Sequence, residues 1–204
     1  MHLLGQSTLG ILMLLSIVML VIIKQLTTGS ILEIPTGVLR VRLANIFNLF
    51  FLLIVLPVSA ILLITRKMEV SDSSHLTFNS SGLLLGLEIV GIVLYVFGYF
   101  LMTWALINLR RNFQLGGSSP RSGDEMVRNG PYRLVRHPMY TAGLGIFLGL
   151  AFLVQSSAIF FLFWIYLILI ILMIPVEEEG LKQVYGEKYT AYQQEVKKLV
   201  PFCY

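Results

Sequence analysis

The sequence predicts an all-α, polytopic membrane protein with five transmembrane helices, the last two of which form a tight hairpin. Of its 204 residues, 56% are hydrophobic and only 13% are charged, and the mean hydropathy is +0.81. An ordinary soluble domain has about 25% charged residues. The apolar residues also form long runs, near the roughly 20 residues that a spanning helix needs. Because little is left for a soluble domain, we expect residues 1–204 to form a single transmembrane domain.

The first three apolar runs predict one helix each, over residues 8–23, 43–65 and 81–109. The first run has no positive residue before its apolar core and no small-residue cleavage site after it. It therefore differs from a cleaved signal peptide, and we expect it to remain as a helix.

The fourth apolar run, from Pro138 to Val176, is too long for one span and is interrupted near Gln155-Ser156-Ser157. It predicts two antiparallel helices, over residues 138–154 and 157–176, joined by a very short turn. After them, apolar and aromatic residues recur at spacings of three and four. This pattern predicts a C-terminal helical tail over residues 177–199.

The positive residues predict the orientation in the membrane. All but two of the 15 lysines and arginines, Arg66 and Lys67, fall in the first loop, the third loop and the C-terminal tail. Five spans place these three regions on one side of the membrane. By the positive-inside rule this side is cytoplasmic, so the C-terminus is cytoplasmic and the N-terminus is outside.

Charge and cysteine content exclude two kinds of partner. The net charge of +4 is explained by the positive residues at the membrane flanks, so we expect no nucleic acid to bind. The single cysteine, Cys203, excludes an internal disulfide framework and a cysteine-clustered metal site. We therefore expect no bound metal.

Small and acidic residues inside the predicted helices need an explanation. Gly82/Gly86 and Gly145/Gly149 have the spacing that is typical of closely packed transmembrane helices. Glu88 lies inside the third predicted helix, where a carboxylate is costly. We expect Glu88 either to have a functional role or to pair with a polar residue such as Asn45 or Asn48.

We expect chemistry at the cytoplasmic end of the last hairpin. The segment Arg136-His137-Pro138-Met139-Tyr140 begins the fourth predicted helix, with Pro138 in its first turn and His137 at its cap. The N-terminus of a helix has unpaired N–H groups and a partial positive charge, and Arg136 adds a full charge. This position suits an anionic group such as a carboxylate or a phosphate.

Glu177 and Glu178 follow the fifth predicted helix, which returns to the same face of the membrane. Their carboxylates would attract a cation across a short gap from the anion site, so a ligand with an α-carboxylate and an α-amine would match both. The basic segment alone is more typical of a membrane flank, and the glutamates alone are more typical of a solvated helix face. Their combination at one face of the membrane favours a ligand-binding site. Because carboxylates are unfavourable at a helix C-terminus, we expect a positive group to compensate them, which would be Arg136, Arg133 or a ligand.

Two longer motifs carry a family resemblance. Residues 130–140 read Gly-Pro-Tyr-Arg-Leu-Val-Arg-His-Pro-Met-Tyr, and Glu177-Glu178 is followed by Leu181, Tyr185-Gly186, Tyr189 and Tyr192. From about Leu109 onward, the chain resembles the isoprenylcysteine carboxyl methyltransferase and phospholipid methyltransferase family of integral membrane methyltransferases. The resemblance implies S-adenosylmethionine as the methyl donor, bound near the cytoplasmic face between the last two helices and the tail.

Carried over by position, the resemblance also implies the residues of the site. Cofactor-binding residues would be Tyr132, Arg136, His137, Pro138, Met139 and Tyr140 on one wall, and Glu177 and Glu178 on the other. Arg136, His137 and Glu178 are the candidate catalytic residues. An aromatic side chain such as Tyr140 would face the sulfonium charge.

The implied reaction is the in-line displacement of a methyl group by a lipophilic nucleophile in a site that excludes water. The acceptor would be an isoprenylcysteine carboxylate or a related small lipid-like molecule that enters from the bilayer. A carboxylate is already ionised and needs no general base. A phospholipid amine, the alternative acceptor, must lose a proton, and His137 is the histidine near the site that would take it.

Two further interpretations remain open. Sterol-type membrane reductases resemble this chain in having an Arg-His-Pro motif at the same place, and they bind NADPH. In those reductases the residue after the proline is typically asparagine and the double glutamate is absent, so Met139 and Glu177-Glu178 favour methyl transfer. The other interpretation is a non-enzymatic membrane protein that keeps the cofactor site as a remnant.

Overall fold

The computed structural model describes residues 3–30, 38–78, 80–113, 120 and 123–200, so Cys203 lies outside the described residues. The α-helices are α1 (Gln6–Thr28), α2 (Leu39–Phe50), α3 (Leu56–Ile64), α4 (Met68–Ser71), α5 (Ser81–Leu109), α6 (Pro138–Val154), α7 (Ser157–Tyr185) and α8 (Glu187–Glu195). A π-helical turn, Phe51–Val55, joins α2 to α3, and 3-10 turns lie at Arg110–Asn112 and Gly130–Arg133. Two isolated bridges are the only β-type pairing in this part of the chain, which confirms the predicted all-α class.

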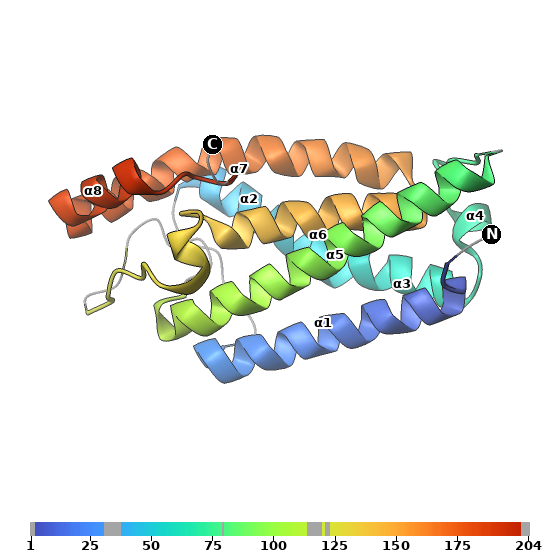
Figure 1. Ribbon diagram of the computed structural model, residues 1–204, viewed down its shortest axis with the longest axis horizontal. Coiled ribbons are helices and arrows are strands. Elements are labelled where there is room, and N and C mark those ends of the chain that lie inside the picture. The colour runs from blue at the N-terminus through green and yellow to red at the C-terminus, as the bar shows by residue number, and fades with distance from the viewer. Residues whose placement is uncertain (1–2, 31–37, 79, 114–119, 121–122, 201–204) are drawn as a thin grey trace.

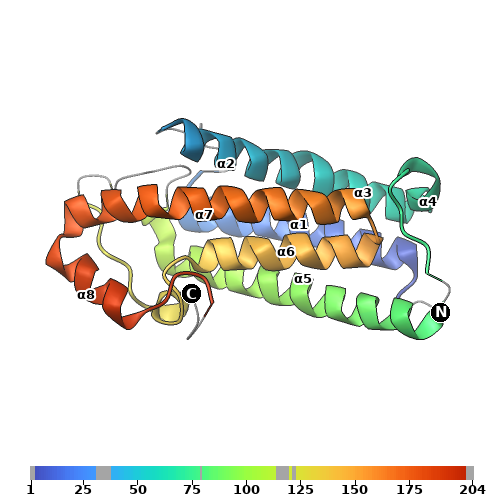
Figure 2. The same ribbon diagram turned by 90° about the horizontal axis from the view of Figure 1, so that it is seen from above.

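The long helices lie side by side in one elongated bundle (Figure 1). Helix α6 lies between α5 and α7, and α1 runs along the other side of α5. The continuous rod of α2 and α3 packs against α7 through α2 and against α1 through α3. Figure 2 shows this rod running alongside α7. The N-terminus of the bundle and α8 lie at opposite ends.

Four helical stretches are long and apolar enough to cross a membrane: Gln6–Thr28, Leu39–Ile64, Ser81–Asn112 and Ser157–Tyr185. Helix α6 is apolar but has only 17 residues. At 1.5 Å per residue its length is about 25 Å, against a hydrocarbon core of about 30 Å. The described residues therefore contain four candidate spans where the sequence predicts five.

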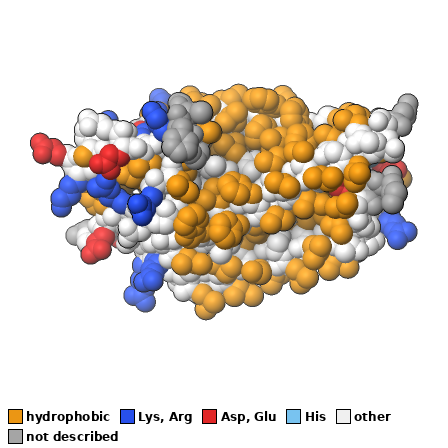
Figure 3. Space-filling model, viewed as in Figure 1, with side chains coloured by type: hydrophobic (Ala, Val, Ile, Leu, Met, Phe, Trp, Pro, Cys, Tyr) orange, Lys and Arg blue, Asp and Glu red, His pale blue; other side chains and the backbone are white. Residues whose placement is uncertain are grey.

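The surface agrees with a membrane location. Charged side chains gather at the end of the molecule that carries α8, and hydrophobic side chains cover its middle (Figure 3). Large apolar side chains such as Leu15, Val93 and Phe161 are mostly exposed along three different helices. A continuous apolar surface of this kind is expected to contact lipid and not water.

Glycines allow α5 and α6 to pack closely. A Cβ on Gly98 would lie 2.7 Å from the Ala142 carbonyl oxygen, and a Cβ on Gly149 would lie 2.7 Å from the Tyr95 nitrogen. The pair Gly145/Gly149 therefore faces α5, as its spacing predicts. The expectation for Gly82/Gly86 is wrong, because a Cβ on Gly86 would meet nothing within 4 Å and one on Gly82 would meet only the Ser80 hydroxyl, at 4.0 Å.

Glu88 has a structural partner that the sequence did not suggest. It is buried in α5 and accepts hydrogen bonds from the backbone N–H groups of Leu3 and Leu4, at 2.9 and 3.1 Å. It thereby caps the chain just before α1, whose own N-cap residue makes no side-chain cap. The expected pairing with Asn45 or Asn48 is wrong, because these two line a cavity at the other end of the bundle.

Helix α7 does not end at Val176 but continues to Tyr185, so Glu177 and Glu178 lie inside a helix and not after it. The predicted tail over residues 177–199 is divided between the end of α7 and the separate helix α8. Gly186, with a φ of 56°, turns the chain between them. The apolar run marks the membrane boundary only, because glutamate is itself a good helix former once its charge has a partner.

Candidate active site

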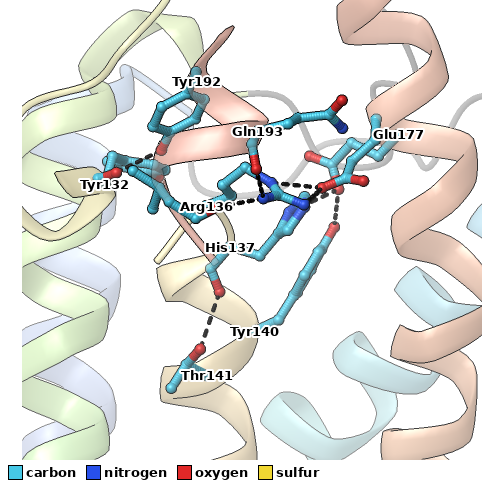
Figure 4. A network of polar contacts seen from close by, with 10 residues as sticks. Tyr132, Arg136, His137, Tyr140, Thr141, Glu177, Tyr192 and Gln193 are labelled. Atoms are coloured by element: carbon cyan, nitrogen blue, oxygen red, sulfur yellow. Dashed lines mark hydrogen bonds and ion pairs between the residues drawn. The ribbon is translucent and has the colours of Figure 1, made fainter. Parts of the chain in front are cut away.

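The site is built where the start of α6 meets the late turns of α7 (Figure 4). His137 is the N-cap residue of α6, and Pro138 occupies the first helical position. A proline fits there because its missing N–H would have no helical acceptor. The local sequence thus turns the chain from the preceding loop into α6 and places Arg136 and His137 against α7.

Arg136 and Glu178 form a buried ion pair. The distance from Arg136 Nε to Glu178 Oε1 is 2.8 Å, and from Nη2 to the same oxygen it is 2.7 Å. Only 6% and 9% of the two side chains are exposed. Arg136 is therefore the positive partner that the sequence requires for the glutamates, and the pair joins α6 to α7.

Arg136 also holds the C-terminal part of the chain. Its Nη1 donates to the carbonyl oxygens of Gln193 and Val196 at the end of α8. A cation that binds the last carbonyls of a helix also compensates the negative end of the helix dipole. The guanidinium thus connects three elements, α6, α7 and α8, and its N–H groups point to protein acceptors.

The segment after α8 pairs with the start of α6 through the backbone. The Arg136 N–H donates to the Lys197 carbonyl at 2.8 Å, and the His137 N–H donates to the Lys198 carbonyl at 3.0 Å. The Thr141 hydroxyl donates to the Leu199 carbonyl at 2.8 Å. These bonds fix the end of the described chain beside the site.

His137 lies between the two glutamates. Its Nε2 is 3.3 Å from Glu178 Oε1, and its Nδ1 is 3.7 Å from Glu177 Oε2. The Tyr140 hydroxyl donates a hydrogen bond of 2.7 Å to Glu177 Oε2, and the Tyr140 ring stacks on the imidazole with centroids 5.5 Å apart. The Glu177 side chain is 28% exposed, so this carboxylate remains the accessible one of the pair.

A cavity of about 350 Å³ opens at this point. Seven of the eight expected cofactor-binding residues line it: Tyr132, Arg136, His137, Pro138, Met139, Tyr140 and Glu177. Glu178 is not part of the lining, because it is turned toward Arg136 and His137. The cavity continues between the helices, where Phe51, Leu56 and Phe147 form apolar walls.

Tyr189 belongs to the same cavity and was not among the expected site residues. It lies in the first part of α8 and is only 3% exposed, and its ring packs edge-on against Tyr192. The sequence placed Tyr189 in the helical pattern of the tail and in the family motif, but it assigned this residue no role in the site. The Tyr192 hydroxyl, in contrast, has a protein partner, the Tyr132 carbonyl oxygen.

Comparisons with known proteins give a family and a similar fold. A family model of phospholipid methyltransferases matches residues 87–188, half of the chain, and this range includes Tyr132 to Glu178. Among solved structures, isoprenylcysteine carboxyl methyltransferase, a eukaryotic intramembrane Ras methyltransferase, superposes with a TM-score of 0.54. The match covers 79% of this chain and 74% of that chain at 20% identity, which shows a similar fold. No curated protein sequence matches the chain.

Proposed function

The chain belongs to the phospholipid methyltransferase family, and on this basis we propose that it transfers a methyl group from S-adenosylmethionine to a lipophilic acceptor in the membrane. The observation that carries this proposal is the single cavity with a charged end and an apolar end. Glu177 and His137 line the charged end, and Phe51 and Phe147 line the part between the helices. A water-soluble cofactor and a lipid-like acceptor can meet in such a cavity.

The residues of the charged end fit the cofactor. A volume of about 350 Å³ lies within the range of roughly 300–1,000 Å³ for small-molecule sites. Glu177 offers a partly exposed carboxylate to the ammonium of the methionine part. Tyr189 offers a buried hydroxyl that has no hydrogen-bond partner among the described residues. When bound, S-adenosylmethionine would supply an electrophilic methyl group, and the electrons of the broken carbon–sulfur bond would stay on sulfur.

The protein's own side chains would hold the cofactor and the acceptor in position and would exclude water from around them. The Arg136–Glu178 pair fixes α8 against α6 and α7, and Tyr140 holds the Glu177 carboxylate in place. The apolar walls remove water from around the acceptor, and holding two reactants in line can supply several kcal/mol of a reaction barrier.

The charge of the cavity supports methyl transfer over the reductase alternative. NADPH carries several phosphate charges and needs cations that are free to bind them. Here the Arg136 guanidinium is already paired with Glu178 and with two carbonyl oxygens. The lining also contains one lysine, Lys24, against three acidic residues, Asp124, Glu125 and Glu177. This lining suits a ligand with positive charge better than a nucleotide with phosphates.

The arrangement of His137 favours a carboxylate acceptor over an amine. Both of its ring nitrogens face glutamate oxygens, so neither is directed at an acceptor. An ionised carboxylate needs no general base, whereas an ammonium group does. We therefore prefer an acceptor of the isoprenylcysteine type, with a phospholipid amine as the second candidate.

We also propose that α6 forms the fifth crossing of the membrane, with the N-terminus outside and the C-terminus cytoplasmic. Helix α6 runs between α5 and α7 for most of the bundle (Figure 1). Its short apolar length is supplemented by the site residues at its start, which would lie at the cytoplasmic interface. The charged end of the molecule (Figure 3) would then face the cytoplasm, in agreement with the positive-inside rule.

Labelled methyl transfer tests the reaction and the acceptor together. The purified protein would receive S-adenosylmethionine with a radioactive methyl group, together with either a total lipid extract or a prenylcysteine analogue. We expect label in the analogue that mild base releases as methanol, which is typical of a carboxyl methyl ester. Base-stable label in the lipid extract would instead indicate N-methylation, and no label in either would reject the proposed function.

A further inference from the structure

The polar side chains of the expected cofactor site are already engaged with one another. The guanidinium of Arg136 binds Glu178 and two carbonyl oxygens of the C-terminal segment. The ring nitrogens of His137 face Glu177 and Glu178, and the hydroxyl of Tyr140 donates to Glu177. A ligand carboxylate therefore needs a donor other than the arginine that the sequence suggested for it.

Tyr189, unlike these side chains, has a polar group that forms no hydrogen bond with any described residue. This group is its hydroxyl, which is buried. A buried hydroxyl without a partner costs about 1–3 kcal/mol, and such groups are uncommon in folded proteins and need an explanation. Tyr189 lines the same cavity as Glu177, so a ligand in the cavity could supply the missing partner.

The electrostatic surroundings keep this hydroxyl as a neutral donor. Burial raises the pKa of the Tyr189 phenol well above its ordinary value, and the negative charge of Glu178 acts in the same direction. Arg136 is close enough to act in the opposite direction. The site of Tyr189 therefore combines a positive side chain, two nearby carboxylates and an O–H that does not ionise.

We propose that the Tyr189 hydroxyl donates a hydrogen bond to the carboxylate of the methionine part of S-adenosylmethionine, next to the ammonium held by Glu177. This assignment rests on the proposed function. The carboxylate and ammonium of an amino acid share one carbon atom, so their two binding groups must be neighbours. Glu177 and Tyr189 line one cavity, and the charge of Glu177 acts on the Tyr189 phenol, so the two groups are near each other as this requires.

The test compares two ligands in the parent protein and in the Tyr189→Phe variant. S-Adenosylhomocysteine has the carboxylate, and decarboxylated S-adenosylhomocysteine differs from it only in lacking that group. A hydrogen bond to a charged group contributes about 1.5–3 kcal/mol, so calorimetry should show a loss of about 10- to 100-fold for S-adenosylhomocysteine. The affinity for the decarboxylated ligand should stay the same.

Thermal unfolding of the ligand-free protein gives a second readout. Tyr189→Phe removes a hydroxyl that has no partner, so the unfolding temperature should be unchanged or higher. The matched control is Tyr95→Phe, because Tyr95 is also buried but its hydroxyl lies 3.1 Å from the Ser16 hydroxyl. This control should lower the unfolding temperature and leave both affinities unchanged.

Three outcomes would overturn the assignment. The affinity of Tyr189→Phe for S-adenosylhomocysteine could equal that of the parent, or it could fall equally for both ligands, which would place the hydroxyl near another part of the cofactor. If the parent protein bound neither ligand, the proposed function would fall and the role of Tyr189 with it.

Discussion

Replacing Arg136 with methionine is expected to lower the free energy of unfolding by about 3–5 kcal/mol, because Glu178 would keep a buried charge without its partner. Both side chains are more than nine-tenths buried and lie 2.7 Å apart. The variant also loses the bonds from Arg136 to Gln193 and Val196, so α8 should become sensitive to proteases. Reversible unfolding in mixed micelles, followed by circular dichroism, measures the loss.

Arg133→Met is the matched control for this experiment. Arg133 precedes Arg136 in the same loop, but its side chain is exposed, and surface replacements usually change stability by less than about 0.5 kcal/mol. The double variant Arg136→Met/Glu178→Met should recover much of the loss, because well-packed apolar residues often replace a buried ion pair at little cost. An Arg136→Met variant as stable as Arg133→Met would contradict the structural role of the pair.

Replacing Glu177 with glutamine is expected to weaken the binding of S-adenosylhomocysteine by about 10- to 100-fold. The change removes the negative charge that we assign to the ligand ammonium, and bonds between charged groups contribute about 1.5–3 kcal/mol. Folding should be little affected, because the side chain is 28% exposed and the glutamine oxygen can still accept from Tyr140. Calorimetry and thermal unfolding of the same sample separate the two effects.

Glu179→Gln removes the same charge from the same helix and serves as the control. Glu179 is exposed and does not line the cavity. The Glu179→Gln variant should bind S-adenosylhomocysteine as tightly as the parent protein does. Equal affinities in the two glutamine variants would mean that Glu177 has no specific part in binding, and the site would have to be sought elsewhere in the cavity.

The apolar pattern of the sequence indicates where helices lie but not where polar residues end them. Helices α5 (Ser81–Leu109) and α6 (Pro138–Val154) cover the ranges that hydropathy predicts. Helix α7 runs past its predicted end and includes residues 177–185 of the predicted tail. Glu178 there pairs with Arg136 from a different part of the chain, and hydropathy within one segment contains no information about that pairing.

The same limit applies to the roles of the site residues. The motifs indicate that Arg136 and Glu178 belong to one site, and the structure brings both to the same point. They leave open which positive group pairs with the glutamates, and they do not indicate that Glu178 takes Arg136 while Glu177 lines the cavity. Tyr189 appears in the sequence as one aromatic residue of a helical pattern and of the family motif. Only the fold shows that its hydroxyl is buried without a hydrogen-bond partner among the described residues.

Binding of S-adenosylhomocysteine and of NADPH to the purified protein, measured by calorimetry under the same conditions, tests the central claim most directly. Our account predicts that S-adenosylhomocysteine binds at a single site and that NADPH does not bind. Tight binding of NADPH, or binding of neither ligand, would contradict the assignment of this cavity to methyl transfer.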